Sequence, residues 1–397
     1  MAKKPQNENF NITVTTLAGL EEVLAEELRA LDMDFIKVGN RAVTCSGNLR
    51  QLYEANLWCR TAIRILKPIH QFKARDEKGL YEQVQKINWA DILDVDMTFA
   101  IDAVVSHSTF EHSLYVSQLT KDAIVDQFRS KTGARPSVDR IRPDIRLNLH
   151  MHENMVTLSL DSSGDSLHRR GYRLQTNVAP LNEVLAAGII GLSGWDKKST
   201  FIDPMCGSGT FLIEAALMAQ NIAPGLFRRD PYGFEKWKDY SEELLKMVWT
   251  TAEAKAKDTP QAEILGFDLD ADYIDAALNN IEEAGLEKVI KVEQANFFET
   301  SAPTAQGVVV MNPPYNERIL SDDINLLYKN IGDTLKNNYQ GYDAFVLTGN
   351  LEAAKNVGLR TSRRIPLYNG SIECRLLKYE LYRGSRKGGE TKAEGEA

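Results

Sequence analysis

The stretch FIDPMCGSGT, residues 201–210, indicates the fold class of the chain. It opens on apolar residues typical of a buried strand, turns at Gly207 and Gly209, and leads into an apolar helical pattern over residues 211–219. A strand, a glycine turn and a helix in this order are the first elements of a doubly wound α/β domain. Because glycines at such a turn let backbone N–H groups come close to a ligand, the turn is also a candidate binding loop.

Three kinds of ligand loop share this outline, and the sequence separates them. A P-loop would need a lysine after Gly209, and a dinucleotide loop would need a third glycine where Leu212 stands. The remaining kind is a loop for S-adenosylmethionine, a cofactor with a cationic amino group and no phosphate. Asp203, at the strand end, supplies a carboxylate for that amine. A plain tight turn is the alternative, so the interpretation depends on residues further along the chain.

Polar residues after the next two strands complete the predicted cofactor site. Asp268 is placed to bind the ribose hydroxyls, and Asn296 lies where a third strand would end and could bond the adenine edge. Asp270 is expected only to cap the following helix. The loop side of the predicted site consists of Met205, Cys206, Gly207, Gly209 and Thr210.

The motif NPPY, residues 312–315, directly follows the apolar run VVVM and is the predicted catalytic loop. Pro313 and Pro314 fix the backbone, so the Asn312 side-chain oxygen and the Pro313 carbonyl form a rigid pair of acceptors. Such a pair stabilises the positive charge that builds on a conjugated amine during methyl transfer. Tyr315 can stack on the base that carries the amine. An ordinary Pro-Pro turn is the alternative, and the motif does not choose among bases.

The remaining strands and helices predict a three-part chain. Residues 11–70 follow the order β-α-β-β-α-β, which is typical of a ferredoxin-like unit. A second α+β unit extends to Asp161 and ends in a hairpin around Glu153 and Asn154. Buried strands are then expected at 200–203, 264–267, 308–311 and 344–347, with a further strand at 375–382.

Composition excludes several functional classes. Apolar residues make up 43% and charged residues 26%, there is no spanning apolar run, and the N-terminus does not look like a signal peptide. The four cysteines are far apart in sequence, which argues against a zinc site and fits a reducing cytosol. No metal is expected, because His107, His112, His150 and His152 lack a set of carboxylates. We therefore expect a cytoplasmic protein without membrane or metal partners.

The net charge of −8 does not by itself indicate a nucleic-acid-binding protein, but the basic residues are clustered. The clusters lie at 168–173, 360–364 and 383–387. Local patches rather than the total charge determine phosphate affinity. Each cluster is either an RNA-facing patch or an ordinary solvated face, and the sequence does not decide between them.

The combined motifs resemble those of THUMP-domain class I methyltransferases, in particular the bacterial enzymes that modify guanine N2 in 23S rRNA. The segments that carry the resemblance are 161–173, 179–183, 203–210, 312–318 and 367–375. It implies a Rossmann-like domain with a seven-stranded, mostly parallel sheet, preceded by ferredoxin-like and THUMP regions that bind RNA. It also implies S-adenosylmethionine as cofactor, with Ala179 near its methionine end.

This resemblance predicts the following domains. They are a ferredoxin-like unit at 10–70, a THUMP domain at 71–161, a linker at 162–176, a methyltransferase domain at 177–383 with an insertion near 221–260, and a disordered tail at 384–397.

Two groups of alternatives stay open. The same chemistry could act on guanine N2 of tRNA or on adenine N6 of a nucleic acid, and similar chains are often labelled adenine-specific DNA methylases. An RNA-binding N-terminal region would explain residues 10–170 and therefore favours RNA as the substrate, and the expected RNA is 23S rRNA or a large-subunit precursor. A non-catalytic RNA-binding ribosome-assembly factor is the rival from another class. The target nucleotide and the oligomeric state are not predicted.

Overall fold

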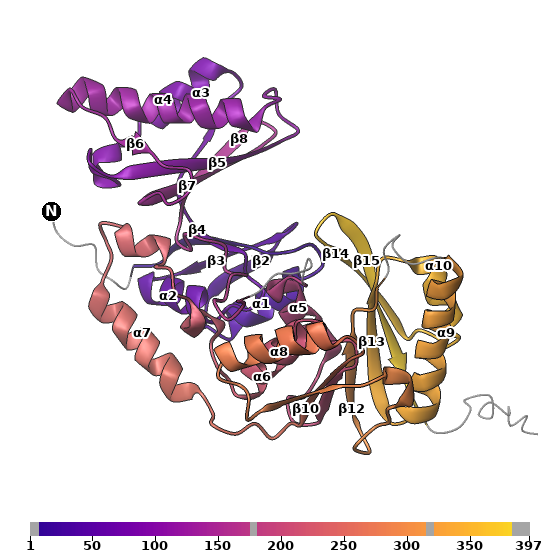
Figure 1. Ribbon diagram of the computed structural model, residues 1–397. Coiled ribbons are helices and arrows are strands. Elements are labelled where there is room, and N and C mark those ends of the chain that lie inside the picture. The colour runs from indigo at the N-terminus through magenta and orange to yellow at the C-terminus, as the bar shows by residue number, and fades with distance from the viewer. Residues whose placement is uncertain (1–7, 175–180, 315–320, 383–397) are drawn as a thin grey trace, which may run out of the picture. The chain divides into compact units, whose positions relative to one another are not determined.

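The computed structural model describes residues 8–174, 181–314 and 321–382, except for the side chains of residues 321 and 322. The chain divides into two compact units (Figure 1). Unit 1 comprises Met1–Gly171 together with Ile222–Ala256, and unit 2 comprises Tyr172–Asn221 together with Lys257–Ala397. Unit 1 therefore contains the N-terminal region and a segment that interrupts the sequence of unit 2.

Unit 1 begins with the predicted ferredoxin-like order, which is confirmed. The elements are β1 (Phe10–Thr15), α1 (Glu21–Arg29), β2 (Asp34–Val38), β3 (Ala42–Gly47), α2 (Leu49–Trp58) and β4 (Arg64–Lys73). β1 lies between β3 and β4 and is antiparallel to both. Ile12 and Val14 alternate toward the helices and are fully buried, as expected for a strand with one covered face.

The THUMP-like part of unit 1 extends the same sheet. It contains α3 (Glu77–Gln85), η1 (Trp89–Asp91), β5 (Thr98–Ser106), α4 (Ser113–Thr132), β6 (Ser137–Val138), β7 (Ile145–His152) and β8 (Met155–Asp161). β4 pairs with β8, so the described strands form one eight-stranded sheet in the order β2-β3-β1-β4-β8-β7-β5-β6. The predicted hairpin is present, because β7 and β8 are antiparallel and Glu153 turns between them at φ 53°.

The segment 222–256 is part of the core of unit 1. It contains η2 (Pro224–Phe227), η3 (Gly233–Lys236) and α7 (Glu242–Lys255). Phe234 is fully buried and stacks on Tyr53 of α2 with ring centroids 4.1 Å apart. The Tyr53 hydroxyl also accepts a hydrogen bond from the Ser241 N–H at 3.1 Å. Aromatic packing therefore holds this segment on the ferredoxin-like part, although it lies between two stretches of unit 2 in sequence.

The connecting segment after β8 is well anchored in unit 1. Ser162 and Ser163 are fully buried, and the Ser163 hydroxyl donates to Asn56 Oδ1 at 3.0 Å. Arg170 is 3% exposed and donates to the Leu167 carbonyl at 2.6 Å. Residues 162–171 are thus packed against unit 1 rather than extended between units.

Unit 2 contains the predicted Rossmann-like sheet, which is confirmed as seven-stranded and mostly parallel among the described residues. Its strands are β9 (Thr200–Asp203), β10 (Ile264–Asp268), β11 (Ile290–Gln294), β12 (Gly307–Met311), β13 (Tyr342–Thr348), β14 (Arg363–Asn369) and β15 (Ile372–Glu380). Their order is β11-β10-β9-β12-β13-β15-β14, with only β14 and β15 antiparallel to their neighbours.

Helices cover this sheet and fix the loops at its edge. They are α5 (Glu183–Ser193), α6 (Thr210–Ala219), α8 (Ala271–Glu283), α9 (Ser321–Asn338) and α10 (Leu351–Ala354), with short turns η4 (Phe297–Glu299) and η5 (Lys355–Val357). Nearly all side chains of α5 and α6 are buried, which fits helices packed on more than one side. None of the helices in the described ranges is both long and apolar enough to cross a membrane.

Candidate functional site

The order of strands in unit 2 creates a point where ligands can bind. The chain passes from β9 to β10 and β11 on one side and then returns to place β12 on the other side of β9. In open α/β sheets, ligands bind outside the carboxyl ends of the strands at such a reversal. Asp203 ends β9, Asp268 ends β10, and Asn312 directly follows β12. We call these three residues, together with the loop 205–210, the switch-point edge.

The loop 205–210 is held to β10 by backbone hydrogen bonds. The Cys206 N–H donates to the Phe267 carbonyl at 2.8 Å, and the Gly207 N–H donates to Asp268 Oδ2 at 2.9 Å. Gly207 and Gly209 have φ angles of 51° and 81°, a region in which other residues are strained. A Cβ atom at Gly207 would meet no atom of the described residues within 4 Å, so these residues leave space beside it for a ligand.

Asp203 is a carboxyl group buried without a cationic partner among the described residues. Its side chain is 1% exposed, and Oδ1 accepts the Met205 N–H at 3.3 Å. Burial raises the pKa of Asp203 well above its usual range; the Met205 N–H opposes this rise and the charge of Asp268 adds to it. A bound cation would offset the cost of that burial. The site therefore fits the cationic amine for which the sequence predicted Asp203.

Asp268 is partly exposed and serves first as a support for the loop. Oδ2 accepts the Gly207 N–H, and Oδ1 accepts the Asp270 N–H at 3.1 Å. Each oxygen keeps a second acceptor position for a hydroxyl group. Asp270 caps α8 by accepting the Asp272 N–H at 2.9 Å, so its predicted capping role is confirmed.

Asn296 lies after β11, on the other side of β10 from β9. Its side chain caps η4: Oδ1 accepts the Phe298 N–H at 3.1 Å, and Nδ2 donates to Glu299 Oε1 at 2.9 Å. Both ends of the amide are thus engaged locally. A contact between Asn296 and adenine stays a prediction.

Asn312 presents an acceptor without a partner. Its Oδ1 atom is buried and has no hydrogen bond from any of the residues that the structure describes. An unpaired buried oxygen costs about 1–3 kcal/mol, so this acceptor is suited to a hydrogen bond from a ligand or an ordered water molecule. Pro313 is buried and Pro314 is exposed. Tyr315 lies outside the described residues, as does Ala179.

Arg173 connects several parts of the loop region, a role that the sequence analysis did not predict, because it placed Arg173 only in the basic cluster at 168–173. Its guanidinium donates to Glu183 Oε1 at 2.9 Å, Ser208 Oγ at 3.3 Å and Thr210 Oγ1 at 3.1 Å. Arg173 is 12% and Glu183 is 7% exposed, so the ion pair is largely shielded from water.

Asn280 of α8 supports the same loop from another side. Its Nδ2 donates to the Ser208 carbonyl at 3.0 Å, and its Oδ1 accepts the Leu174 N–H at 3.1 Å. Asn280 is 1% exposed. Ser208 therefore accepts two hydrogen bonds, one from Arg173 at its hydroxyl group and one from Asn280 at its carbonyl group.

These buried roles change the interpretation of the basic cluster at 168–173. Arg170 and Arg173 are bound internally within their respective units, because each guanidinium satisfies buried carbonyl or carboxylate oxygens. Neither is the solvated or RNA-facing side chain that the cluster suggested. Arg169 keeps a 70% exposed side chain, so only part of the cluster is accessible.

Neither Cys206 nor a cluster of metal-binding side chains points to further chemistry among the described residues. Burial raises the pKa of Cys206 well above its usual range, with smaller contributions in the same direction from Asp203 and Asp268. A protonated, buried thiol is a poor nucleophile. No group of three or more metal-binding side chains occurs within residues 8–174, 181–314 and 321–382.

Comparison with known families matches three consecutive parts of the chain. Residues 11–66 match the RlmL ferredoxin-like domain, and residues 74–161 match the THUMP domain. Residues 170–378, more than half of the chain, match the RMKL-like methyltransferase domain.

Individual relatives extend over nearly the whole chain. The Synechocystis sp. protein named "Putative RNA methyltransferase slr0064" is 41% identical over 93% of this chain and 96% of its own length. The "Ribosomal RNA large subunit methyltransferase K/L" of Methylococcus capsulatus is 42% identical over 92% of this chain, which spans only 50% of that relative. The crystal structure of SMU.472, "a putative methyltransferase complexed with SAH", is 32% identical with a TM-score of 0.86, covering 95% of this chain and 100% of that one.

Proposed function

This chain belongs to the RMKL-like methyltransferase family, with an RlmL ferredoxin-like domain and a THUMP domain, and on that premise we propose that it methylates a base in RNA. The methyl donor is S-adenosylmethionine, and the acceptor is an exocyclic amino group. Guanine N2 of 23S rRNA is the preferred target. The names of the relatives from Synechocystis and Methylococcus capsulatus support an RNA substrate, the second one specifically a large-subunit rRNA.

The residues of the switch-point edge fit the cofactor. S-adenosylmethionine supplies an electrophilic methyl group on a sulfonium centre. Asp203 offers a desolvated carboxyl group to the cationic amine of the methionine end, and Asp268 keeps acceptor positions for the ribose hydroxyls. The open space beside Gly207 admits a ligand against the loop backbone. Leu269, which is 70% exposed beside Asp268, offers an apolar surface to the adenine ring.

Asn312 is the single observation that carries the proposed chemistry. Its buried oxygen has no partner among the described residues and lies after β12, the strand next to Asp203 at the switch point. An amino group bound there would donate one N–H to Asn312 Oδ1 and the other to the Pro313 carbonyl. Both acceptors would stabilise the positive charge that develops on nitrogen as it takes the methyl group. The methylated nitrogen then loses a proton to water without a strong base.

The decisive experiment is methylation of RNA from a strain that lacks the gene. Purified protein and labelled S-adenosylmethionine are added to large-subunit RNA from that strain, and modified nucleosides are mapped by mass spectrometry. The proposal expects N2-methylguanosine at a position that is unmodified in the deletion strain. N6-methyladenosine as the product, or transfer to tRNA alone, would replace the proposed target.

A cofactor titration distinguishes an active enzyme from an RNA-binding assembly factor with an inactive domain. Isothermal titration of the folded protein with S-adenosylmethionine is expected to show one site. Absence of binding, combined with intact RNA binding, would favour the assembly factor.

A further inference from the structure

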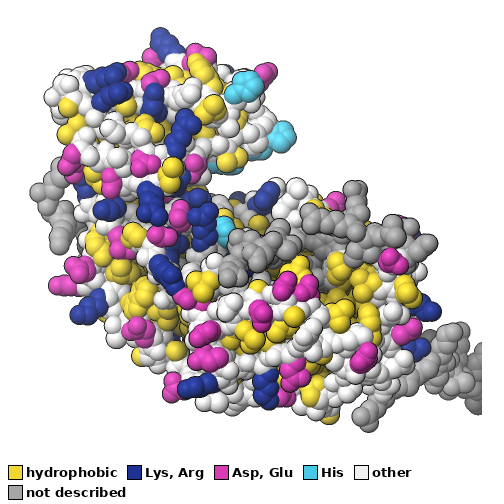
Figure 2. Space-filling model, viewed as in Figure 1, with side chains coloured by type: hydrophobic (Ala, Val, Ile, Leu, Met, Phe, Trp, Pro, Cys, Tyr) yellow, Lys and Arg dark blue, Asp and Glu magenta, His cyan; other side chains and the backbone are white. Residues whose placement is uncertain are grey.

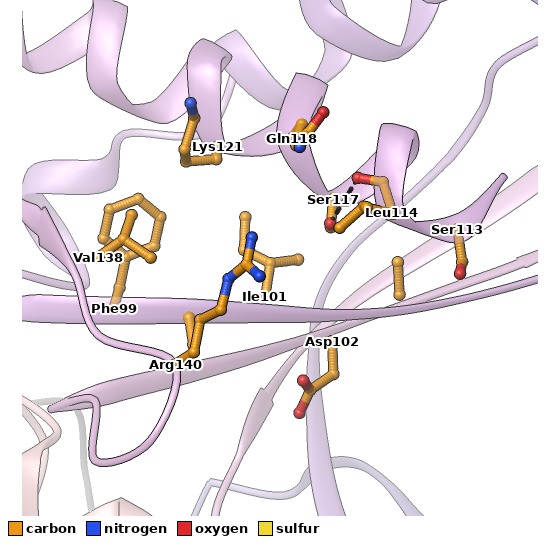
Figure 3. Close-up of a pocket in the computed structure, with 12 residues that line it drawn as sticks. Phe99, Ile101, Asp102, Ser113, Leu114, Ser117, Gln118, Lys121, Val138 and Arg140 are labelled. Atoms are coloured by element: carbon orange, nitrogen blue, oxygen red, sulfur yellow. Dashed lines mark hydrogen bonds between the residues drawn. The ribbon is translucent and has the colours of Figure 1, made fainter.

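Unit 1 contains a groove between helix α4 and the edge of strand β5 (Figure 3). The groove encloses about 330 Å³, within the range of roughly 300–1,000 Å³ that is typical of ligand pockets. Ile101 and Ala103 line it from β5, Leu114 and Gln118 from α4, and Arg140 from the segment after β6. We call it the α4–β5 groove. It lies entirely within the residues that match the THUMP domain.

The β5 side of the groove is an open sheet edge. β6 pairs only with Thr98 and Phe99, while β7 pairs with the whole length of β5 from Phe99 on. The Phe99 carbonyl faces the β6 side, where it accepts the Asp139 N–H at 3.2 Å. Because successive residues of a strand alternate, Ile101 and Ala103 direct their N–H and C=O groups to this same edge. No described strand pairs with them there, so two donors and two acceptors are available to a ligand.

The side chains around this edge combine apolar surface with positive charge. Leu114 is 57% and Val138 is 47% exposed, so both offer apolar surface to a ligand in the groove. Arg140 extends from its segment toward α4, on which Lys121 and Gln118 lie (Figure 3). The Arg140 guanidinium has no partner among the described residues, and the pair between Lys121 and Asp122 is exposed and therefore weak.

Asp122, outside the groove lining, pairs with Lys121 at 2.6 Å, but little negative charge lines the groove itself. Asp102 is the single carboxylate among the groove-lining residues, and it pairs with Arg146 at 3.0 Å. In Figure 3 it points away from α4. Arg135 and Arg142, also exposed, add positive charge near Arg140 in sequence, which Asp139 and Asp144 offset in part. Lys and Arg side chains, with Asp and Glu side chains among them, are visible over the part of the surface where α4 and β6 lie (Figure 2). The groove thus suits an anionic ligand.

We propose that the α4–β5 groove binds one unpaired nucleotide of the RNA substrate. The Ile101 and Ala103 backbone groups bond the edge of the base, Leu114 and Val138 contact its face, and Arg140 and Lys121 contact the flanking phosphates. A nucleotide in a duplex cannot enter, because its base edge is already paired and stacked. The inference rests on the proposed function, since it takes RNA as the ligand, but it assigns a separate site on unit 1.

Crosslinking locates the contact directly. Full-length protein is irradiated with a 12-nucleotide single-stranded RNA that contains 4-thiouridine, and the linked peptides are sequenced by mass spectrometry. Crosslinks are expected in peptides that contain residues 99–103, 113–121 or 138–140, and they should disappear when the RNA is annealed to its complement. Crosslinks confined to other regions would overturn the proposal, as would equal labelling by the duplex.

Binding measurements test the role of charge. Fluorescence anisotropy with the same RNA should show a Kd about tenfold higher for Arg140→Ala, and a salt dependence shallower by about 0.7 for each lost phosphate contact. Gln118→Trp, which fills the groove from the exposed face of α4, should weaken binding without removing charge. Lys86→Ala removes an exposed cation of the same domain that does not line the groove, and its Kd should stay within about twofold.

Two further outcomes separate this inference from the proposed function. Asn312→Ala should crosslink at the groove like the unaltered protein. A loss of methyl transfer in this variant therefore does not contradict the groove proposal. If Arg140→Ala and Gln118→Trp methylate RNA efficiently and bind it with an unchanged Kd, the groove proposal is wrong and the proposed function still stands. An acidic peptide that binds in an Arg140-dependent manner, while single-stranded RNA does not, would also overturn the nucleotide in favour of a peptide.

Discussion

The switch-point edge and the α4–β5 groove offer their polar groups to a ligand in opposite ways. At the edge, Asp203 is 1% exposed, and Asn312 presents a buried oxygen without a described partner. In the groove, the cations and the apolar contacts are exposed, as Leu114 is at 57%. Buried groups act through fixed geometry, whereas exposed cations act through additive phosphate contacts. Changes at the edge should therefore have larger effects than changes in the groove.

The largest effect is expected from Arg173→Ala. Removal of the guanidinium leaves the Glu183 carboxylate, 7% exposed, without its partner and releases Ser208 and Thr210. Breaking a buried ion pair on one side costs about 3–5 kcal/mol in the free energy of unfolding. Urea unfolding should show this loss, and hydrogen exchange should show faster opening of the amides at 207–210.

Two variants calibrate this loss. Arg129→Ala breaks an exposed pair with Asp126 and should cost less than about 1 kcal/mol. The double variant Arg173→Met with Glu183→Gln leaves no unpaired charge and should regain most of the stability. A loss in Arg173→Ala no larger than that in Arg129→Ala would contradict the role of Arg173 as a buried support of the loop.

Asn312→Ala should have the next largest effect, and on turnover rather than stability. Loss of one preorganised acceptor of this kind costs about 2.7–4 kcal/mol in the transition state, or about a hundred- to a thousandfold in kcat. Single-turnover methyl transfer measures the rate, and isothermal titration should show cofactor affinity within about threefold of the unaltered protein.

Asn325→Ala is the matched control for Asn312→Ala. Asn325 is an exposed residue of α9 whose side chain accepts a hydrogen bond from Asn356. Its replacement should leave the single-turnover rate unchanged. Near-normal turnover in Asn312→Ala would remove the basis of the proposed chemistry.

The same contrast explains what the sequence could predict. The glycine loop and the residues around Asp203, Asp268 and Asn312 are local patterns, and their placement at strand ends could be predicted from the sequence. The support that Arg173 and Asn280 give to the loop could not be inferred in this way. These two residues are more than 100 positions apart, and they come together only when α8 packs on the loop. For the same reason, Arg170 and Arg173 in the segment HRRGYR could be interpreted from the sequence only as surface charges.

One strand and the groove were also beyond the reach of local patterns. The third strand expected before Asn296 is present as β11, whereas β14 was not predicted, because it contains Pro366 on the edge of the sheet, where a missing N–H donor is tolerated. The α4–β5 groove exists because β5 lies next to the short edge strand β6. That position follows from the long-range pairing of β4 with β8 and of β5 with β7.

Asp203→Asn should have a smaller effect than Asn312→Ala, and on affinity. The amide keeps the shape of the side chain but not its charge, so the cationic end of the cofactor loses a charge-assisted hydrogen bond worth about 1.5–3 kcal/mol. Isothermal titration should show a Kd for S-adenosylmethionine about 10- to 150-fold higher. The exposed replacement Asp272→Asn on α8 is the control, and an equal shift in that variant would contradict the assignment.

The raised pKa of Asp203 predicts a pH dependence that this variant should lack. In the free protein, burial favours the protonated carboxyl group, so stability falls as pH rises from the ordinary aspartate pKa through the raised one. A bound cation favours the carboxylate instead. Cofactor binding should therefore release a proton in that window, and affinity should rise with pH by up to about tenfold per unit. Titrations in buffers of different ionisation enthalpy measure the proton, and proton uptake would contradict the sign.

The smallest expected effect is the coupling between the two sites. Arg140→Ala should raise the RNA concentration for half-maximal rate about tenfold, while Asn312→Ala lowers the rate itself. Since these changes act on separate steps and share no described contact, their free energies should add within about 0.5 kcal/mol in the double variant. Steady-state kinetics of the single and double variants measure this sum. A coupling above about 1 kcal/mol would mean that the nucleotide in the groove helps to place the target amine, and the two regions would then form one recognition system.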